Sequence, residues 1–285
     1  MDTFPFTELP PELALEIIRV AASPQFQLPS VTTPRRRPYY ATALALSAVS
    51  YRIRLVTMPH LLHTVVLNSD IQTFSFNTSI TLQHSFQQTS SRLALDYKKL
   101  VRRLWSTECW ESLIIDDLGG LVDYSPMYEV IRNVRSLGFT TCSQYLLYSG
   151  LEANPRDWTC RCLTVTGLSW RWNPLISTSE GQAFLQKVTH LVVSIASKPK
   201  STNRLPSWLK NVPFKYMPAL THFAFPTFTL SRVDPGTCRG WIETEHPELY
   251  EILKDVEIRP FPSLGEENKW ELAFLRGTIW PGEDG

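Results

Sequence analysis

A pattern of short apolar segments recurs through the second half of the chain and limits the folds that are open to it. The segments begin near residues 101, 134, 161, 188 and 220, and each carries a leucine or phenylalanine at its centre. These central residues lie 33, 26, 28 and 32 positions apart and are Leu104, Leu137, Leu163, Leu191 and Phe223. Helix-like stretches follow them, such as 128–133, 181–187 and 246–253. A strand–helix unit of this length cannot bury its own apolar face, so successive units must stack.

The fold class follows from this spacing. A strand and a helix repeated at intervals of this size are typical of leucine-rich repeats, although the asparagine ladder position of regular repeats is absent. We therefore expect an α/β chain (α+β overall), in which an N-terminal helical segment precedes an irregular leucine-rich-repeat-like domain. The expected division is a helical domain at 1–65, a connector at 66–100 and a repeat domain at 101–285. The alternative is an ordinary α/β domain whose strands share a similar apolar pattern.

The N-terminal segment opens with an amphipathic helix over residues 9–22. Pro10 and Pro11 suit a helix N-terminus, because the amide hydrogen that proline lacks would have no partner there. Leu13 and Ile17 lie four residues apart and therefore share one face. Ser23 and the proline after it end the helix.

A proline-rich loop at 24–38 separates this helix from a second one over about 40–55. Met58-Pro59 either ends the second helix or opens a short third helix that runs through residue 63. The first strand is expected at 64–67, where the sequence is Thr-Val-Val-Leu.

Both helices resemble the F-box motif. Its usual opening, an apolar residue and Leu-Pro followed by a Leu- and Ile-containing helix, is matched at Phe6, Leu9, Pro10, Glu12, Leu13, Ile17 and Ile18. Its leucine-rich second helix is matched across 44–54, and 59–65 looks like its closing segment. The layout is similar to the F-box-like proteins of mushroom-type fungi. The chain departs from the motif in its long 24–38 insertion, and in having Ile53 near the place where a tryptophan is frequent.

The resemblance implies a role in recruiting targets to a cullin–RING ubiquitin ligase of the Skp–cullin–F-box type. The helices would bind a Skp-type adaptor protein, and through it a cullin. The residues implied in this contact are Leu9, Pro10, Leu13, Ile17, Leu44 and Val49. The alternative for Leu13 and Ile17 is that they pack against the chain's own C-terminal domain. For Ile18, Leu46 and Ile53 we expect packing within the helical hairpin itself.

The resemblance also implies that the C-terminal repeats bind a protein target, usually on the concave face that strand side chains form. Tryptophans outside the repeat positions are candidate contacts, because tryptophan is frequent among binding hot spots. These are Trp158, Trp170, Trp172 and Trp208. The alternative is that each belongs to the core of this aromatic-rich chain.

The composition of the chain limits the class of partner and the cellular compartment that we expect. The formal net charge is +1, which argues against a protein that coats nucleic acid. The chain opens without a basic, apolar leader, and no apolar run is long enough to span a membrane. The five cysteines are odd in number and irregularly spaced, which is unlike a disulfide framework. We therefore expect a cytoplasmic or nuclear protein.

The histidines and cysteines of the chain do not form the residue patterns of known catalytic or metal sites. Cys160 and Cys162 lack the second pair that a zinc site requires, and the hydrolase motif Gly-x-Ser-x-Gly is absent. His190 and His222 occupy equivalent positions in two repeats, and we expect them to form a ladder or a shared exposed face rather than a catalytic pair. The sequence thus predicts a protein that is not an enzyme and has no catalytic residues, cofactor or metal. The competing hypothesis to the ligase adaptor is a repeat-based scaffold that engages no ligase, in which the N-terminal helices only cap the stack.

Overall fold

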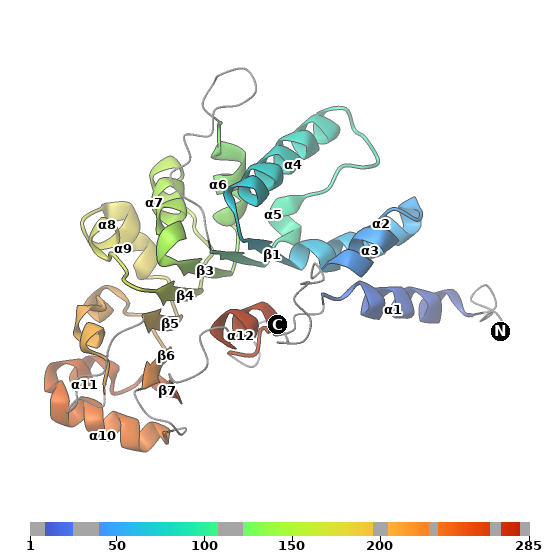
Figure 1. The fold of residues 1–285 in the computed structure, drawn as a ribbon. Coiled ribbons are helices and arrows are strands. Elements are labelled where there is room, and N and C mark those ends of the chain that lie inside the picture. Colours follow the sequence, from blue (N-terminus) through green and yellow to red (C-terminus); the bar gives the residue numbers. More distant parts are fainter. Residues whose placement is uncertain are drawn as a thin grey trace.

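A seven-stranded, wholly parallel sheet runs through the protein (Figure 1). The structure is a computed structural model that describes residues 9–24, 40–107, 122–195, 205–227, 233–262 and 269–279. The strands follow one another across the sheet in chain order. They are β1 (Thr64–Leu67), β2 (Arg103–Ser106), β3 (Ser136–Thr140), β4 (Cys162–Gly167), β5 (His190–Ile195), β6 (His222–Thr227) and β7 (Glu257–Pro262).

The register of the strands confirms the predicted alignment of the five apolar positions. Leu104 pairs with Leu137, Leu137 with Leu163, Leu163 with Leu191, and Leu191 with Phe223. The same row continues outward to Val65 on β1 and Ile258 on β7. All of these side chains belong to one buried core. The aligned row of buried side chains therefore extends one strand further at each end than the five segments indicate.

Helices cover one face of the sheet and share this core (Figure 1). Parallel neighbours need a crossover between them, and helices supply most of these crossovers here. The helices on this face are α4 (Asp70–Gln88), α6 (Ser125–Ile131), α7 (Gln144–Ala153), α9 (Ser179–Leu185), α10 (Pro235–Glu245) and α11 (Pro247–Leu253). Shorter elements complete the connections: α5 (Tyr97–Leu100), α8 (Asn173–Ile176), η2 (Thr141–Ser143), η3 (Ser207–Asn211) and η4 (Phe214–Tyr216).

The opposite face of the sheet holds the last helix, α12 (Lys269–Arg276) (Figure 1). Trp105 on β2 packs against Phe274 with ring centroids 5.1 Å apart. The buried Arg103 guanidinium donates to the Phe274 carbonyl at 2.9 Å, where a cation opposes the negative end of the helix dipole. Gly277 makes this approach possible, because its φ of +65° suits glycine and a side chain would collide with Arg103.

Three helices precede the sheet: α1 (Pro11–Ala22), α2 (Ala41–Ser47) and α3 (Tyr51–His63). The predicted helix over 40–55 is thus two helices, and the break falls at residues 48–50 rather than at Met58-Pro59. The side chain of Ser50 accepts a hydrogen bond from the Ile53 amide and caps α3. Pro59 lies inside α3, which continues to His63. The predicted loop at 24–38 lies outside the described residues except for Pro24.

The expected boundaries of the connector differ from the structure. Strand β1 pairs along its whole length with β2, so residues 64–67 belong to the sheet. The segment 66–100 supplies the end of β1 together with α4 and α5, and Ile80 of α4 is fully buried in the main core. This segment therefore contributes to the sheet and to its main core.

Candidate protein-docking surface

Helix α1 has two different apolar faces. Ile18 and Ala22 face inward and are buried, with Ile18 only 6 % exposed. Leu13 and Ile17 remain 53 % and 45 % exposed, and Val20 continues this outer stripe one turn later. Ile18 is thus buried, as expected, while Leu13 and Ile17 lie on the outer side of the helix. The alternative, burial of Leu13 and Ile17 against the chain's own C-terminal domain, is not what the structure shows.

The second helical segment exposes apolar residues as well. Leu44 is 52 % exposed at the middle of α2, and Val49 is 65 % exposed just after it. Leu46 and Ile53 are half-buried, as expected for residues that hold the helices together. Of the Leu-Pro pair before α1, Leu9 is half-buried and Pro10 is exposed. We refer to Leu13, Ile17, Val20, Leu44 and Val49 together as the N-terminal apolar set.

This helical unit is joined to the sheet without a loop. Helix α3 ends at His63 and β1 begins at Thr64. Met58 and Leu62 of α3 enter the main core, and the Tyr40 hydroxyl donates to the Thr64 carbonyl. The unit thus covers the β1 edge of the sheet while its outer apolar side chains stay exposed. Exposed leucines are common singly, whereas a group of them on one small helical unit makes this surface a candidate docking site.

The four candidate tryptophans are buried, which argues against a role as surface anchors and favours the core alternative. Trp158 packs edge-on against Phe184 and donates its indole N–H to the Asn154 carbonyl at 2.7 Å. Trp208 donates to the Ile195 carbonyl at 3.0 Å. Trp170 and Trp172 pack together with ring centroids 5.9 Å apart and also belong to the main core. Indoles that find carbonyl partners fill large volumes between crossover segments.

The face of the sheet expected to bind a target is partly occupied by the chain itself. Trp105, Val192 and Ala224 form a second buried cluster with Phe274 and Leu275 of α12. A target could reach this face only beside α12. The sequence could not show this, because the last helix follows the final strand and its contacts span 171 residues, as between Arg103 and Phe274.

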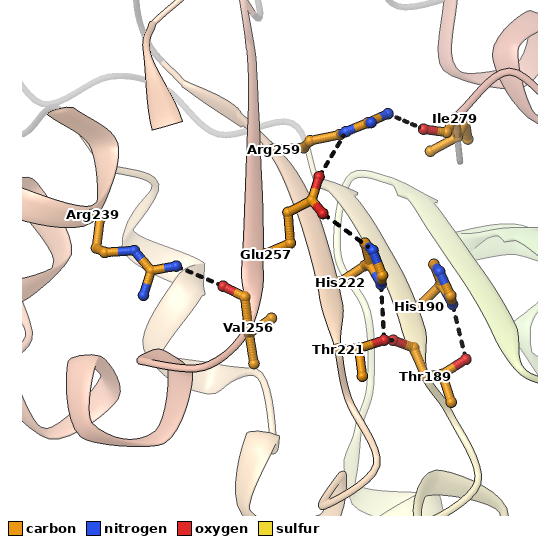
Figure 2. Close-up of polar contacts among 9 residues, drawn as sticks. All are labelled: Thr189, His190, Thr221, His222, Arg239, Val256, Glu257, Arg259 and Ile279. Carbon is orange, nitrogen blue, oxygen red and sulfur yellow. Dashed lines mark hydrogen bonds and ion pairs between the residues drawn. The ribbon is translucent and has the colours of Figure 1, made fainter. Parts of the chain in front are cut away.

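A polar ladder crosses the same face at β5, β6 and β7 (Figure 2). His190 and His222 are register partners, and their rings stack 4.2 Å apart with an interplanar angle of 7°. Glu257 on β7 lies 3.2 Å from Nε2 of His222 and 3.5 Å from Nε of Arg259. Arg259 in turn donates to the Ile279 carbonyl beyond α12. Sequence reasoning aligned the two histidines but missed Glu257 and Arg259, because β7 was not identified.

The chemistry of this ladder is that of a structural network. The Thr221 hydroxyl donates to the Thr189 carbonyl at 3.0 Å and lies 2.8 Å from Nδ1 of His222, so it links the ring to the backbone just before β5. Burial, and then the neighbouring His222, lower the pKa of His190 to about 4, while Glu257 opposes the shift.

Within the residues that the structure describes, no group of three or more His, Cys, Asp or Glu side chains could hold a metal ion. No helix in these ranges combines the length and apolar character needed to cross a membrane. Comparisons of the chain with family models, with curated proteins and with solved structures found no match.

Proposed function

We propose that this protein is a substrate-recruiting adaptor subunit of a cullin–RING ubiquitin ligase. In this proposal the N-terminal helices are an F-box that binds a Skp-type adaptor, and the sheet domain is an irregular leucine-rich-repeat-like domain that holds a protein target. The chemistry takes place on other subunits, and this chain contributes proximity.

The exposure of the N-terminal apolar set carries the proposal. The residues implied by the F-box resemblance include Leu13, Ile17, Leu44 and Val49, and all four side chains are about half exposed or more. Their neighbours Ile18 and Ala22 are buried, so α1 is packed on its inner face while these side chains stay exposed. A partner groove that covers such side chains uses the helix-in-groove mode of recognition.

The test is co-purification of the full chain with a Skp-type adaptor, followed by a titration. We expect wild-type binding in the micromolar range or tighter. Full burial of a Leu or Ile side chain contributes about 1.5–3 kcal/mol, so covering the exposed halves of Leu13 and Ile17 contributes roughly 1.5–3 kcal/mol together. Loss of this contribution weakens binding roughly 10- to 150-fold. Leu13→Asp with Ile17→Asp adds the cost of burying two carboxylates and should abolish binding.

A matched control is available on α4. Ile71 and Leu82 are also exposed apolar residues but lie outside the N-terminal unit. Ile71→Asp with Leu82→Asp changes the charge of the chain equally and should leave adaptor binding intact. Both double variants should keep the wild-type far-UV circular dichroism, because all four side chains are exposed. Absence of wild-type binding at micromolar concentration would refute the ligase role.

The second candidate is a repeat-based interaction scaffold whose N-terminal helices only cap the sheet. The seating of Met58 and Leu62 in the main core, at the β1 edge, favours a capping role for α3. This function predicts that no Skp-type adaptor binds and that removal of residues 1–63 exposes the β1 edge and causes aggregation.

A further inference from the structure

An open groove of about 830 Å³ lies at the end of the sheet where the strands begin. The residues that immediately precede β2, β3, β4 and β5 contribute to its lining, together with α5. Six of its lining side chains are cationic: Lys98, Lys99, Arg102, Arg135, Arg161 and Lys187. Asp157 is the one carboxylate among the residues that line it. The chain as a whole is nearly neutral, so this charge is a local concentration.

Three of these cations form a row. Arg102, Arg135 and Arg161 each occupy the position just before a strand, and backbone hydrogen bonds join them in order. The Arg135 amide donates to the Arg102 carbonyl at 3.1 Å, and the Arg161 amide donates to the Arg135 carbonyl at 2.9 Å. Neighbouring strands are about 4.8 Å apart, so the three arginines start from adjacent points along one edge. All three are exposed.

Two of the cations, at the α5 end of the groove, have acidic partners. Lys98 forms an ion pair with Glu129 at 2.5 Å, and Lys99 pairs with Asp96 at 3.1 Å. Within the described ranges no carboxylate lies at ion-pair distance from Arg102, Arg161 or Lys187. The Arg161 guanidinium donates to the Lys187 carbonyl at 3.1 Å, and the Lys187 ammonium donates to the Trp158 carbonyl at 3.2 Å. These carbonyl contacts do not neutralise the positive charges, which would attract an anionic ligand.

The shape and chemistry of the groove identify the class of ligand. A volume of this size suits several residues of a peptide rather than a single small anion. Binding of single-stranded nucleic acid relies on exposed aromatic platforms. The one tryptophan in the lining, Trp158, is buried and engaged with Phe184 and Asn154. We propose that the groove binds a peptide segment of a partner protein that carries closely spaced acidic groups, either carboxylates or phosphates.

This inference goes beyond the proposed ligase role and names the chemistry of a partner for the sheet domain. It can fail independently of that role, since peptide binding is measured on the purified full chain without any Skp-type adaptor. Loss of adaptor binding in the Leu13→Asp, Ile17→Asp variant should leave peptide binding unchanged.

The test is fluorescence anisotropy with three labelled twelve-residue peptides of one backbone sequence. The first carries glutamates at alternate positions, the second phosphoserines, and the third glutamines. We expect the first or the second to bind and the glutamine peptide not to bind, with affinity that falls as salt is raised. The tighter of the two acidic peptides identifies the anion. Replacing Arg102, Arg135 and Arg161 with glutamine should weaken binding about 10- to 100-fold.

Two further variants separate charge in the groove from charge elsewhere and from folding. Arg102→Glu changes a single exposed side chain and should also weaken peptide binding. It serves as the test if the triple variant is unstable. Arg171→Glu with Lys210→Gln alters exposed cations that lie beyond the opposite ends of β4 and β5, and should change affinity less than about two-fold. Failure of both acidic peptides to bind, equal losses in the groove and control variants, or tighter binding of a single-stranded RNA of matched charge would each overturn the proposal.

Discussion

Gly138→Ala should loosen the packing of α12 on the sheet. Gly138 is the register partner of Trp105 on β2. A methyl group added there would lie 2.2 Å from Cε3 and 2.6 Å from Cζ3 of the Trp105 indole. Carbon atoms cannot approach this closely, so the indole must move, and its other side already packs against Phe274. The displacement therefore passes to α12.

The magnitude follows from these contacts. Forcing one extra methyl into a packed site costs about 1–3 kcal/mol. Disrupting the Trp105–Phe274 ring pair adds about 0.5–1.5 kcal/mol. We expect the free energy of unfolding to fall by roughly 2–4 kcal/mol, measured by urea denaturation followed by circular dichroism.

Gly240→Ala is the matched control. Gly240 lies on the exposed side of α10, and an added methyl would have no atom within 4 Å. Replacing a glycine by alanine inside a helix stabilises it by about 0.5–1 kcal/mol. The same chemical change should thus have opposite signs at the two sites. A Gly138→Ala variant as stable as wild type would refute the reasoning that this glycine makes room for Trp105.

Three further outcomes follow from individual side chains. The lowered pKa of His190 means that the folded protein resists protonation of this ring, so its stability is full above the unfolded pKa near 6.5 and is lost as pH falls toward 4. His190→Gln should therefore reduce the loss of stability in acid by about 1–2 kcal/mol after allowance for solvent screening. Urea denaturation at pH 7 and pH 4.5 measures this difference. Asp234→Ala should lower the free energy of unfolding by about 1 kcal/mol, because the Asp234 carboxylate caps α10 by accepting hydrogen bonds from the amides of Gly236 and Thr237. Asp234→Asn keeps a side-chain acceptor and should retain most of this stability in the same assay. Burial raises the pKa of Cys238 to about 12, so its thiol stays protonated and unreactive at pH 8. Brief iodoacetamide treatment at pH 8 should modify the exposed Cys142 and spare Cys238. Mass spectrometry of the peptides measures this, and alkylation of Cys238 would contradict the prediction.

The sheet was predictable because its signal is local and repeated. Each central leucine, from Leu104 to Leu191, lies in an apolar run short enough to be a buried strand, and the near-regular spacing aligned the runs in the correct register. Ile258 lies 35 residues after Phe223 and is flanked by charged and proline residues, so the same signal is weak at β7. The split of α2 from α3 depends on the Ser50 cap, and a serine within a helical pattern does not by itself indicate a break.

The candidate sites were predictable only in part, since they depend on tertiary position. The outward stripe of Leu13 and Ile17 followed from helical periodicity, but only the packing of α1 against its neighbours separated it from Ile18. Exposure of the tryptophans could not be read from sequence, because an indole outside the repeat pattern can equally fill the space beneath a crossover. The arginine row was not predicted, although the aligned segments place Arg102, Arg135 and Arg161 at one shared position before the strands.

The N-terminal apolar set and the cationic groove are linked by backbone contacts at the end of the sheet where the strands begin. All strands of a parallel sheet begin at the same end of the sheet. Because these strands follow chain order, the residues before β2 to β5 lie in a row that starts beside the residue before β1. That residue is His63, the last of α3, and its carbonyl accepts from the Arg102 amide at 3.0 Å. The helical unit that carries the N-terminal apolar set therefore ends where the arginine row begins, with a backbone hydrogen bond and no loop between them. A peptide bound along that row would be held at a fixed place relative to whatever covers the apolar set. An adaptor that works through proximity requires this kind of rigid relationship, because freedom between the two bound partners would dilute the effective concentration that it creates.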